Sequence, residues 1–255
     1  MTYFCTLASG SSGNSAVYVS DRQSLLIDAG KNARYLRESL RRLALDAADL
    51  SHILITHSHS DHVSALPVLL KHTRATLVCS HDTFSAIADR LPQGTPVRLF
   101  TPGESLLLGM VPVRTFATSH DAPGSCGYVL GRVGEQAAVC TDLGTVTGEN
   151  FETLRGSRVV LLEFNHDAGL VKTGPYPYYL KQRILSEQGH LSNKFAAKVA
   201  RRLCQTGTET VILAHLSAEN NTPELALSTA REGLEGLEAR LLLAPRSEPG
   251  ELILL

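Results

Sequence analysis

The sequence predicts an α/β protein built from two β-sheets with helices on their outer faces. Short apolar runs rich in Val, Ile, Leu and Tyr recur in both halves of the chain, which is typical of many strands. The first runs follow one another without helices, and helical patterns then alternate with the later ones. This mixture favours two packed sheets over one doubly wound parallel sheet. No linker or repeat divides residues 1–255, so we expect a single domain.

Apolar runs bounded by Gly, Pro and polar residues predict the strands, and apolar positions at helical spacing predict the helices. The predicted strands are Tyr3–Ala8, Ala16–Val19, Ser24–Ile27, His52–Ile55, Thr76–Cys79, Val97–Phe100, Val111–Ala117, Cys126–Leu130, Ala137–Thr141, Val159–Glu163, Thr210–Ala214, Arg240–Leu243 and Glu251–Leu254. The predicted helices are Ala33–Leu43, Val63–Lys71, Ser80–Arg90, Tyr176–Gln188, Ser192–Cys204 and Pro223–Leu237.

Composition indicates where the protein is located and which classes of partner its charge favours. The net charge is −1, so no global field indicates nucleic acid or an anionic membrane. The five cysteines, an odd number, are not closely spaced, and most lie in apolar runs, which predicts reduced and buried thiols. The opening "MTYFCTLASGSSGNS" has neither a basic segment nor a long apolar stretch. We therefore expect no signal peptide, no membrane span and a cytoplasmic location.

The stretch "ITHSHSDH" (Ile55–His62) follows a predicted strand and concentrates three of the ten histidines in one turn. Imidazole and carboxylate groups are the usual ligands of zinc-like ions. In extended geometry His57 and His59 point the same way, and Asp61 and His62 can turn toward a second point nearby. The spacing predicts two ligand pairs for two neighbouring metals, although a solvated polar loop is the simpler alternative.

Further ligands are expected at the ends of other strands, where side chains are held at a sheet edge. His120 follows the apolar run in "RTFATSHD", Asp142 follows that in "AAVCTDLG", and His215 follows that in "VILAHLS". Each is separately explained as a polar residue at a strand end. Together with the histidine-rich turn, they complete a set for two metals.

The order of these residues resembles that of the metallo-β-lactamase-fold hydrolases, and the resemblance spans most of the chain. It implies a four-layer αββα sandwich with a dinuclear site at the edge between the sheets. Asp28, in "LLIDAG", matches the family's first motif, in which the carboxylate supports the ligand loop from behind. The alternative for Asp28 is a helix cap.

Carried over by motif, the ligands form two sets joined by a bridging carboxylate: His57, His59 and His120 for one metal, Asp61, His62 and His215 for the other, and Asp142 between them. Asp61 is thereby also expected to take part in catalysis. Zn²⁺ and Mn²⁺ both suit such ligands, and Fe is also compatible.

Two further stretches, "LLEFNHD" and "GHLSNKFAAKVA", indicate the substrate side of the site. The second resembles the segment of transfer-RNA 3′-processing enzymes whose His helps the leaving group depart; His190 is the matching residue, and Glu163 is placed to orient it. We expect the remaining polar side chains of these stretches to bind substrate: Asn165, His166, Ser192 and Asn193. The simpler alternatives are a helix start capped by Ser192 or Asn193 and a solvated loop.

With "LASGSSGNS", these stretches resemble the YycJ (WalJ) branch, small cytoplasmic proteins to which DNA exonuclease activity is attributed. Although "LASGSSGNS" could form an anion-binding loop, a hairpin turn is the preferred interpretation.

Residues 172–202 hold seven basic residues against one acid, a local charge of +6, together with three tyrosines. Such residues can neutralise phosphates and stack on bases, but the solvated face of two amphipathic helices, with the tyrosines packed inward, explains them equally well.

The predicted function is that of a dinuclear metal-dependent phosphodiesterase or nuclease, expected to be a DNA exonuclease. A hydroxide bridging the metals would attack phosphorus, and His190 would assist the leaving group. The partner is a nucleic acid, expected to be DNA. One alternative is a small-molecule hydrolase of the same fold that acts on a thioester, a lactone or a cyclic phosphodiester. The other is a non-catalytic metal-binding regulatory module.

Overall fold

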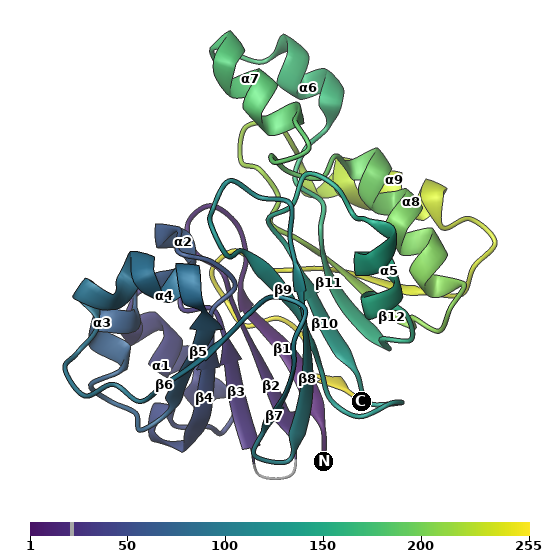
Figure 1. The fold of residues 1–255 in the computed structure, drawn as a ribbon. Helices are drawn as coiled ribbons and strands as arrows, with labels where there is room; N and C mark the ends of the chain where they lie inside the picture. Colours follow the sequence, from purple (N-terminus) through teal and green to yellow (C-terminus); the bar gives the residue numbers. More distant parts are fainter. Residues whose placement is uncertain (21–22) are drawn as a thin grey trace.

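The computed structural model describes residues 1–20 and 23–255, which form four layers in the order helix, sheet, sheet, helix (Figure 1). Two seven-stranded sheets pack face to face in the middle, and helices cover the outer face of each. The predicted αββα sandwich is therefore confirmed. Among the described helices, none is long and apolar enough to cross a membrane.

The first sheet has the strand order β14-β1-β2-β3-β4-β5-β6. Strands β14, β1, β2 and β3 are antiparallel neighbours, and β3 to β6 are parallel. The strands are β1 (Tyr3–Ala8), β2 (Ser15–Ser20), β3 (Gln23–Ile27), β4 (Leu50–Leu54), β5 (Thr76–Ser80), β6 (Val97–Phe100) and β14 (Ile253–Leu254). Because β14 pairs with β1, the two termini lie side by side, at the bottom in Figure 1.

The second sheet has the order β13-β12-β11-β10-β9-β8-β7. It is antiparallel from β7 to β10 and parallel from β10 to β13. Its strands are β7 (Ser105–Leu108), β8 (Val111–Ala117), β9 (Cys126–Leu130), β10 (Ala137–Cys140), β11 (Val159–Glu163), β12 (Thr210–Ala214) and β13 (Arg240–Leu243).

The helices fall into three sets. The first sheet is covered by α1 (Ala33–Arg42), α2 (Ser60–Val63), α3 (Leu66–Leu69) and α4 (His81–Ile87), with short 3₁₀ turns at Ala47–Asp49 and Ala88–Arg90. The second sheet is covered by α5 (Gly148–Leu154), α8 (Asn193–Cys204) and α9 (Pro223–Gly233). Helices α6 (Ala168–Thr173) and α7 (Tyr178–Leu185) form a hairpin that stands apart from both layers, at the top in Figure 1.

Three apolar layers hold the sandwich together. The outer two lie between each sheet and its helices; Leu36 and Leu40 of α1 belong to the first of them. The central layer lies between the sheets and includes the fully buried Phe4, Tyr18 and Tyr128. Burying side chains of this size stabilises the fold by about 1.5–3 kcal/mol each. The alternating and continuous apolar runs of the sequence therefore find partners on every sheet face.

The structure differs from the predicted elements where local patterns are weak. Strand β7 was not predicted, since it is short and alternates exposed with buried residues at the edge of its sheet. The predicted helix Val63–Lys71 is broken into α2 and α3, with Pro67 in the first turn of α3, where its missing N–H is tolerated. Helices α5 and α6 were also missed, and both are short.

One buried hydrogen bond joins the two sheets beside the histidine-rich turn, and its loss gives a prediction. The Tyr128 hydroxyl donates to the Ile55 carbonyl oxygen at 2.6 Å, with Tyr128 fully buried. We expect Tyr128→Phe to lower the free energy of unfolding by about 1–3 kcal/mol, because a buried acceptor loses its partner. Urea denaturation measures the change. The control is Tyr178→Phe, whose side chain is exposed; equal stability of both variants would contradict the role given to this bond.

Candidate metal centre and active site

The ligands predicted from the sequence all lie at one edge of the sandwich, where strands of both sheets end. The turn Ile55–His62 follows β4 in the first sheet. In the second sheet, His120 follows β8, Asp142 follows β10 and His215 follows β12. Strand β8 runs parallel to β10 because both are antiparallel to β9, so these chain ends meet at the same edge. The carboxyl ends of strands are the usual location of sites in α/β proteins.

Strained backbone aims three of the side chains at this edge. Among the described non-glycine residues, positive φ angles occur at Asp28 (59°), Ala44 (57°), Asp142 (59°) and His215 (54°). Three of these four residues lie in the site. A left-handed residue directly after a strand turns its side chain out of the pleat, and such strain persists only where the surroundings enforce it. The strain is therefore concentrated where side-chain direction matters.

The first ligand group consists of His57, His59 and His120. One nitrogen from each lies within 4.8 Å of the other two, and His59 Nδ1 is 3.3 Å from His120 Nε2. The Thr56 hydroxyl lies 3.0 Å from His57 Nδ1. That contact leaves His57 Nε2 buried without a hydrogen-bond partner. Three nitrogens thus converge on one point.

The second ligand group consists of Asp61, His62 and His215. His62 Nε2 lies 3.6 Å from Asp61 Oδ2, and His215 Nε2 lies 3.5 Å from the same oxygen. Asp142 approaches this group with Oδ2 at 3.3 Å from His62 Nε2 and Oδ1 at 3.5 Å from His215 Nε2. Asp142 also shares a cluster with His57, so its carboxylate lies between the two groups.

Asp28 holds the turn from below. Its Oδ2 accepts a hydrogen bond from His62 Nδ1 at 2.7 Å, and its Oδ1 accepts from the Thr56 backbone N–H at 2.8 Å. Asn32, rather than Asp28, caps helix α1. Gly30 makes this packing possible, because a Cβ there would lie 1.6 Å from the Asp61 carbonyl oxygen.

Glu163 holds the other side of the site. It is fully buried at the end of β11, and its Oε1 accepts from His190 Nδ1 at 2.7 Å and from His215 Nδ1 at 3.2 Å. Its Oε2 accepts from the backbone N–H groups of Leu143 and Leu191 at 3.2 and 3.1 Å. One carboxylate thus fixes the orientation of two imidazoles and joins three loops.

Electrostatics follows from burial and from this pairing. Burial lowers the pKa of His57 well below its usual value, so its imidazole is neutral, the form that can bind a metal. Burial also acts to lower the pKa of His215, but Asp142, Asp61 and Glu163 outweigh it and raise that pKa to about 10. For Asp142, His215 and His62 outweigh burial and hold the pKa well below its usual value. The carboxylates therefore stay ionised and demand positive charge.

The residues fit a metal centre. His57 Nε2, His215 Nε2 and Asp142 Oδ2 are buried without hydrogen-bond partners, although such atoms are normally satisfied. The second nitrogens of His62 and His215 are both bound to carboxylates, the arrangement that fixes histidine ligands at metals. The unpaired atoms and the clusters of His and Asp side chains therefore suit divalent cations at this edge.

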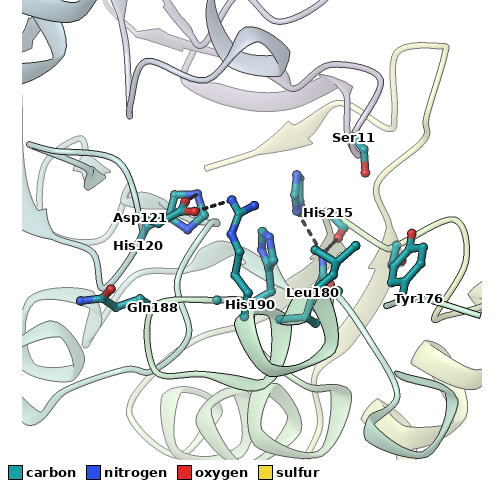
Figure 2. A pocket seen from close by; sticks show the side chains of 13 residues that line it. Ser11, His120, Asp121, Tyr176, Leu180, Gln188, His190 and His215 are labelled. Atoms are coloured by element: carbon teal, nitrogen blue, oxygen red, sulfur yellow. Dashed lines mark hydrogen bonds and ion pairs between the residues drawn. The ribbon is translucent and has the colours of Figure 1, made fainter. Parts of the chain in front are cut away.

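A cavity of about 190 Å³ opens beside the ligands (Figure 2). His120, His190 and His215 line it on the ligand side, and residues of α7 line it on the other. Arg183 and Asp121 both line the cavity and form an ion pair, and Figure 2 shows Asp121 beside His120. His190 is the residue predicted to assist the leaving group, and it is stacked on His215 with ring centroids 5.3 Å apart.

Of the four residues predicted to bind substrate, the structure places one at the cavity and three away from it. Asn165 lines the cavity and donates to the His215 carbonyl oxygen at 2.9 Å. His166 is buried and does not line this cavity; burial lowers its pKa to about 4. Ser192 caps α8 through the Phe195 N–H. Asn193 is buried and bonds Asn221 at 2.9 Å.

The basic stretch 172–202 does not form one charged face. Arg201 donates to the carbonyl oxygens of Gly233 and Glu235, and Arg202 lies over the Phe151 ring at 4.0 Å. Lys172, Lys181 and Arg183 instead belong to the α6–α7 hairpin. Tyr178 and Tyr179 on that hairpin are 77% and 74% exposed, so they do not pack inward.

Sequence reasoning missed several residues of the site. The segment "LASGSSGNS" does make a turn, but Asn14 Nδ2 donates to Asp61 Oδ2 at 3.2 Å, and Ser9 Oγ accepts from the His215 N–H at 2.8 Å. Thr56 precedes the motif as an unremarkable strand-end residue. Asp121 stood in the quoted stretch "RTFATSHD"; its Oδ1 lies 3.4 Å from His120 Nε2.

The comparisons agree with this geometry. A family model described as "Beta-lactamase superfamily domain" matches residues 23–216. "Exodeoxyribonuclease YycJ" of Bacillus anthracis is 33% identical over 236 residues, which cover 91% of this chain and 89% of that protein. "Exodeoxyribonuclease WalJ" of Streptococcus pneumoniae is 34% identical over 230 residues, which cover 89% and 86%.

A solved structure gives the same fold. The metallo-β-lactamase fold protein YhfI of Bacillus subtilis superposes with a TM-score of 0.75 over 98% of this chain and 100% of that one, at 16% identity. The domain match, the near full-length relatives and the fold lead to one assignment. This chain belongs to the metallo-β-lactamase-fold superfamily of metal-dependent hydrolases, in the branch that contains the YycJ and WalJ proteins.

Proposed function

We propose that this protein is a metal-dependent exodeoxyribonuclease that hydrolyses phosphodiester bonds at the ends of DNA. The observation that carries the proposal is the position of His190, which lines one cavity together with ligands from both groups. The relatives named exodeoxyribonucleases, which match along about nine-tenths of this chain, support DNA as the substrate.

The ligand groups define which residues would hold the metals. The first ligand group would hold one ion, the second ligand group another, and Asp142 would contact both. When bound, two such ions lower the pKa of coordinated water and neutralise charge on phosphate oxygens. Asp61 and Asp142 contribute negative charge that favours divalent cations over protons. Imidazole and carboxylate ligands suit Zn²⁺ and Mn²⁺, and Fe also fits.

His190 is the proposed proton donor to the leaving oxygen. Burial acts to lower its pKa, but the Glu163 carboxylate outweighs burial and raises it, which favours the protonated form that a proton donor needs. Glu163 binds Nδ1, which leaves Nε2 as the nitrogen available to the substrate. His190 is one-fifth exposed, whereas Glu163 behind it is fully buried. The pair therefore resembles an acid with a fixed orienting base.

The cavity also favours a second candidate. Its volume of about 190 Å³ is below the roughly 300–1,000 Å³ of clefts that take drug-sized ligands. A small cyclic or linear phosphodiester would fit such a space. The same small volume suits the end of a polymer, of which a single unit enters, so the two candidates must be separated by substrate.

Labelled DNA separates the candidates. The protein, loaded separately with Mn²⁺ and Zn²⁺, is incubated with 5′- and 3′-labelled linear DNA and with closed circular single-stranded DNA. We expect linear strands to shorten from one end and circles to stay intact, with no activity in His59→Ala. Cut circles would contradict exonuclease action. If linear DNA stays intact while the same metal-loaded protein hydrolyses a cyclic nucleotide, the substrate is a small phosphodiester and not DNA.

His190→Ala is expected to keep two metals per chain and to lower turnover by about 10²–10⁴-fold, the usual contribution of a positioned proton donor. Metal analysis beside initial rates on DNA measures both quantities. Loss of metal from this variant would make His190 a ligand instead. The exposed His81 provides the control, since His81→Ala should retain both metal and rate.

Asp142→Ala is expected to reduce the metal content from two ions per chain to below one, because its carboxylate lies between the two ligand groups. Asp142→Asn tolerates the left-handed backbone of this position, so it separates loss of charge from strain. Asp46→Asn, far along the chain, serves as control. Full occupancy by two ions in both Asp142 variants would argue against a bridging carboxylate.

A further inference from the structure

Helix α7 forms the wall of the cavity that faces the metal ligands. Leu180, Arg183 and Ile184 line the cavity from the helix, and Tyr176 lines it from the preceding turn. Positions three and four apart share one helix face, so α7 turns a single side toward the ligands. Figure 2 shows Leu180 between Tyr176 and His190 in this view, and all of them line the cavity together with His215. The wall is thus part aromatic, part aliphatic and part cationic.

Arg183 is the only Lys or Arg among the described residues that line the cavity. Its guanidinium is paired with Asp121, and Asp121 Oδ1 lies 3.7 Å from His59 Nε2 and 3.4 Å from His120 Nε2. The Arg183 side chain is 57% exposed and that of Asp121 29%. Such a solvated pair contributes little to stability, so a stronger anion can replace the carboxylate.

We propose that Arg183 binds a phosphate of the terminal nucleotide of DNA, exchanging Asp121 for it, and that Tyr176 and Leu180 pack against the base of that nucleotide. The inference rests on the proposed function and names the residues that recognise its substrate. Guanidinium matches phosphate in charge and geometry, with two parallel hydrogen bonds. An aromatic ring stacks on any base, so the site would be sequence-tolerant.

The chain fixes Arg183 relative to His190. The His190 N–H donates to the Ile184 carbonyl oxygen at 3.2 Å, which ties His190 to the end of α7. Between them, Gly189 packs so closely that a Cβ would lie 2.2 Å from the Arg183 carbonyl oxygen and 2.4 Å from that of Ile184. A phosphate held by Arg183 would therefore stand at a set position from the proton donor. Positioning of this kind lowers the barrier of a reaction without new chemistry.

The small volume of the cavity favours a chain end as the part of the strand that enters it. About 190 Å³ leaves room for about one unit of a polymer, so a terminal nucleotide suits the cavity better than an internal stretch of a strand. The exposed Tyr178 and Tyr179 lie outside this cavity, next to the lining residues in sequence. They leave further stacking surface for the nucleotides that stay outside.

The test measures DNA binding and cleavage by Arg183→Gln in the metal-loaded protein. We expect KM for single-stranded DNA to rise about tenfold or more, because a charge-assisted contact is lost. The slope of log affinity against log salt should become shallower by about 0.7, the value for one phosphate contact on a single strand. Arg183→Lys should restore the slope, and metal content should not change. Arg34→Gln, which removes an exposed arginine paired with Glu38, is the control without effect.

Two more variants test the base and the exchange. Tyr176→Ala should weaken DNA binding by at least about fivefold. Tyr176→Phe should bind DNA like wild type, because stacking needs the ring and not the hydroxyl. Asp121→Asn should bind DNA more tightly than wild type, because the competing carboxylate charge is gone.

The outcomes distinguish a failure of this inference from a failure of the proposed function. Wild-type protein that shortens DNA while Arg183→Gln keeps the same KM and salt slope would overturn this inference and leave the proposed function standing. Loss of metal in Arg183→Gln would make the residue structural and overturn it as well. Wild-type protein that is metal-loaded but neither binds nor shortens DNA would remove the proposed function and the inference together.

Discussion

The site depends on carboxylates buried beneath histidines. Asp28, Asp142 and Glu163 are at most 3% exposed, and a buried carboxylate is tolerated only when it is paired and hydrogen-bonded. Asp28 binds Nδ1 of His62 and Glu163 binds Nδ1 of His215, so Nε2 of each imidazole faces Asp61 and Asp142. Asp142 instead presents an oxygen without a hydrogen-bond partner. The negative charge thus fixes the histidines and attracts cations at the same time.

This arrangement requires both sheets. The first sheet supplies the histidine-rich turn and Asp28, and the second supplies Asp142, Glu163 and His215. Neither sheet alone gathers a complete ligand group, because His120 and His215 approach across the central layer. Tyr128 and Ser9 form hydrogen bonds across this boundary, so the geometry of the site depends on the packing of the core.

Much of this could be predicted from the sequence because the signals are local. The strands Tyr3–Ala8, Val159–Glu163 and Thr210–Ala214 have the predicted bounds, since mostly apolar runs that are buried throughout leave little choice. Likewise, the structure brings all the predicted metal ligands to one edge, because each lies in the segment that follows a strand. Their order along the chain carried the resemblance to the family.

The contacts that no local pattern encodes were missed. Asn14 reaches Asp61 across 47 positions, and Arg183 pairs with Asp121 across 62, so only the fold brings them together. His166 and Asn193 stood in polar stretches that predict a surface, yet tertiary packing buries both. The prediction missed strand β7 because this edge strand is short and buries only every second residue, which leaves too weak a pattern.

The central claim is that buried carboxylates orient the histidines around two ions. Anomalous diffraction from crystals of the metal-loaded protein, recorded on both sides of the metal absorption edge, tests it most directly. The account predicts two peaks: one among His57, His59 and His120, the other among Asp61, His62 and His215. A single peak, or peaks away from these residues, would contradict it.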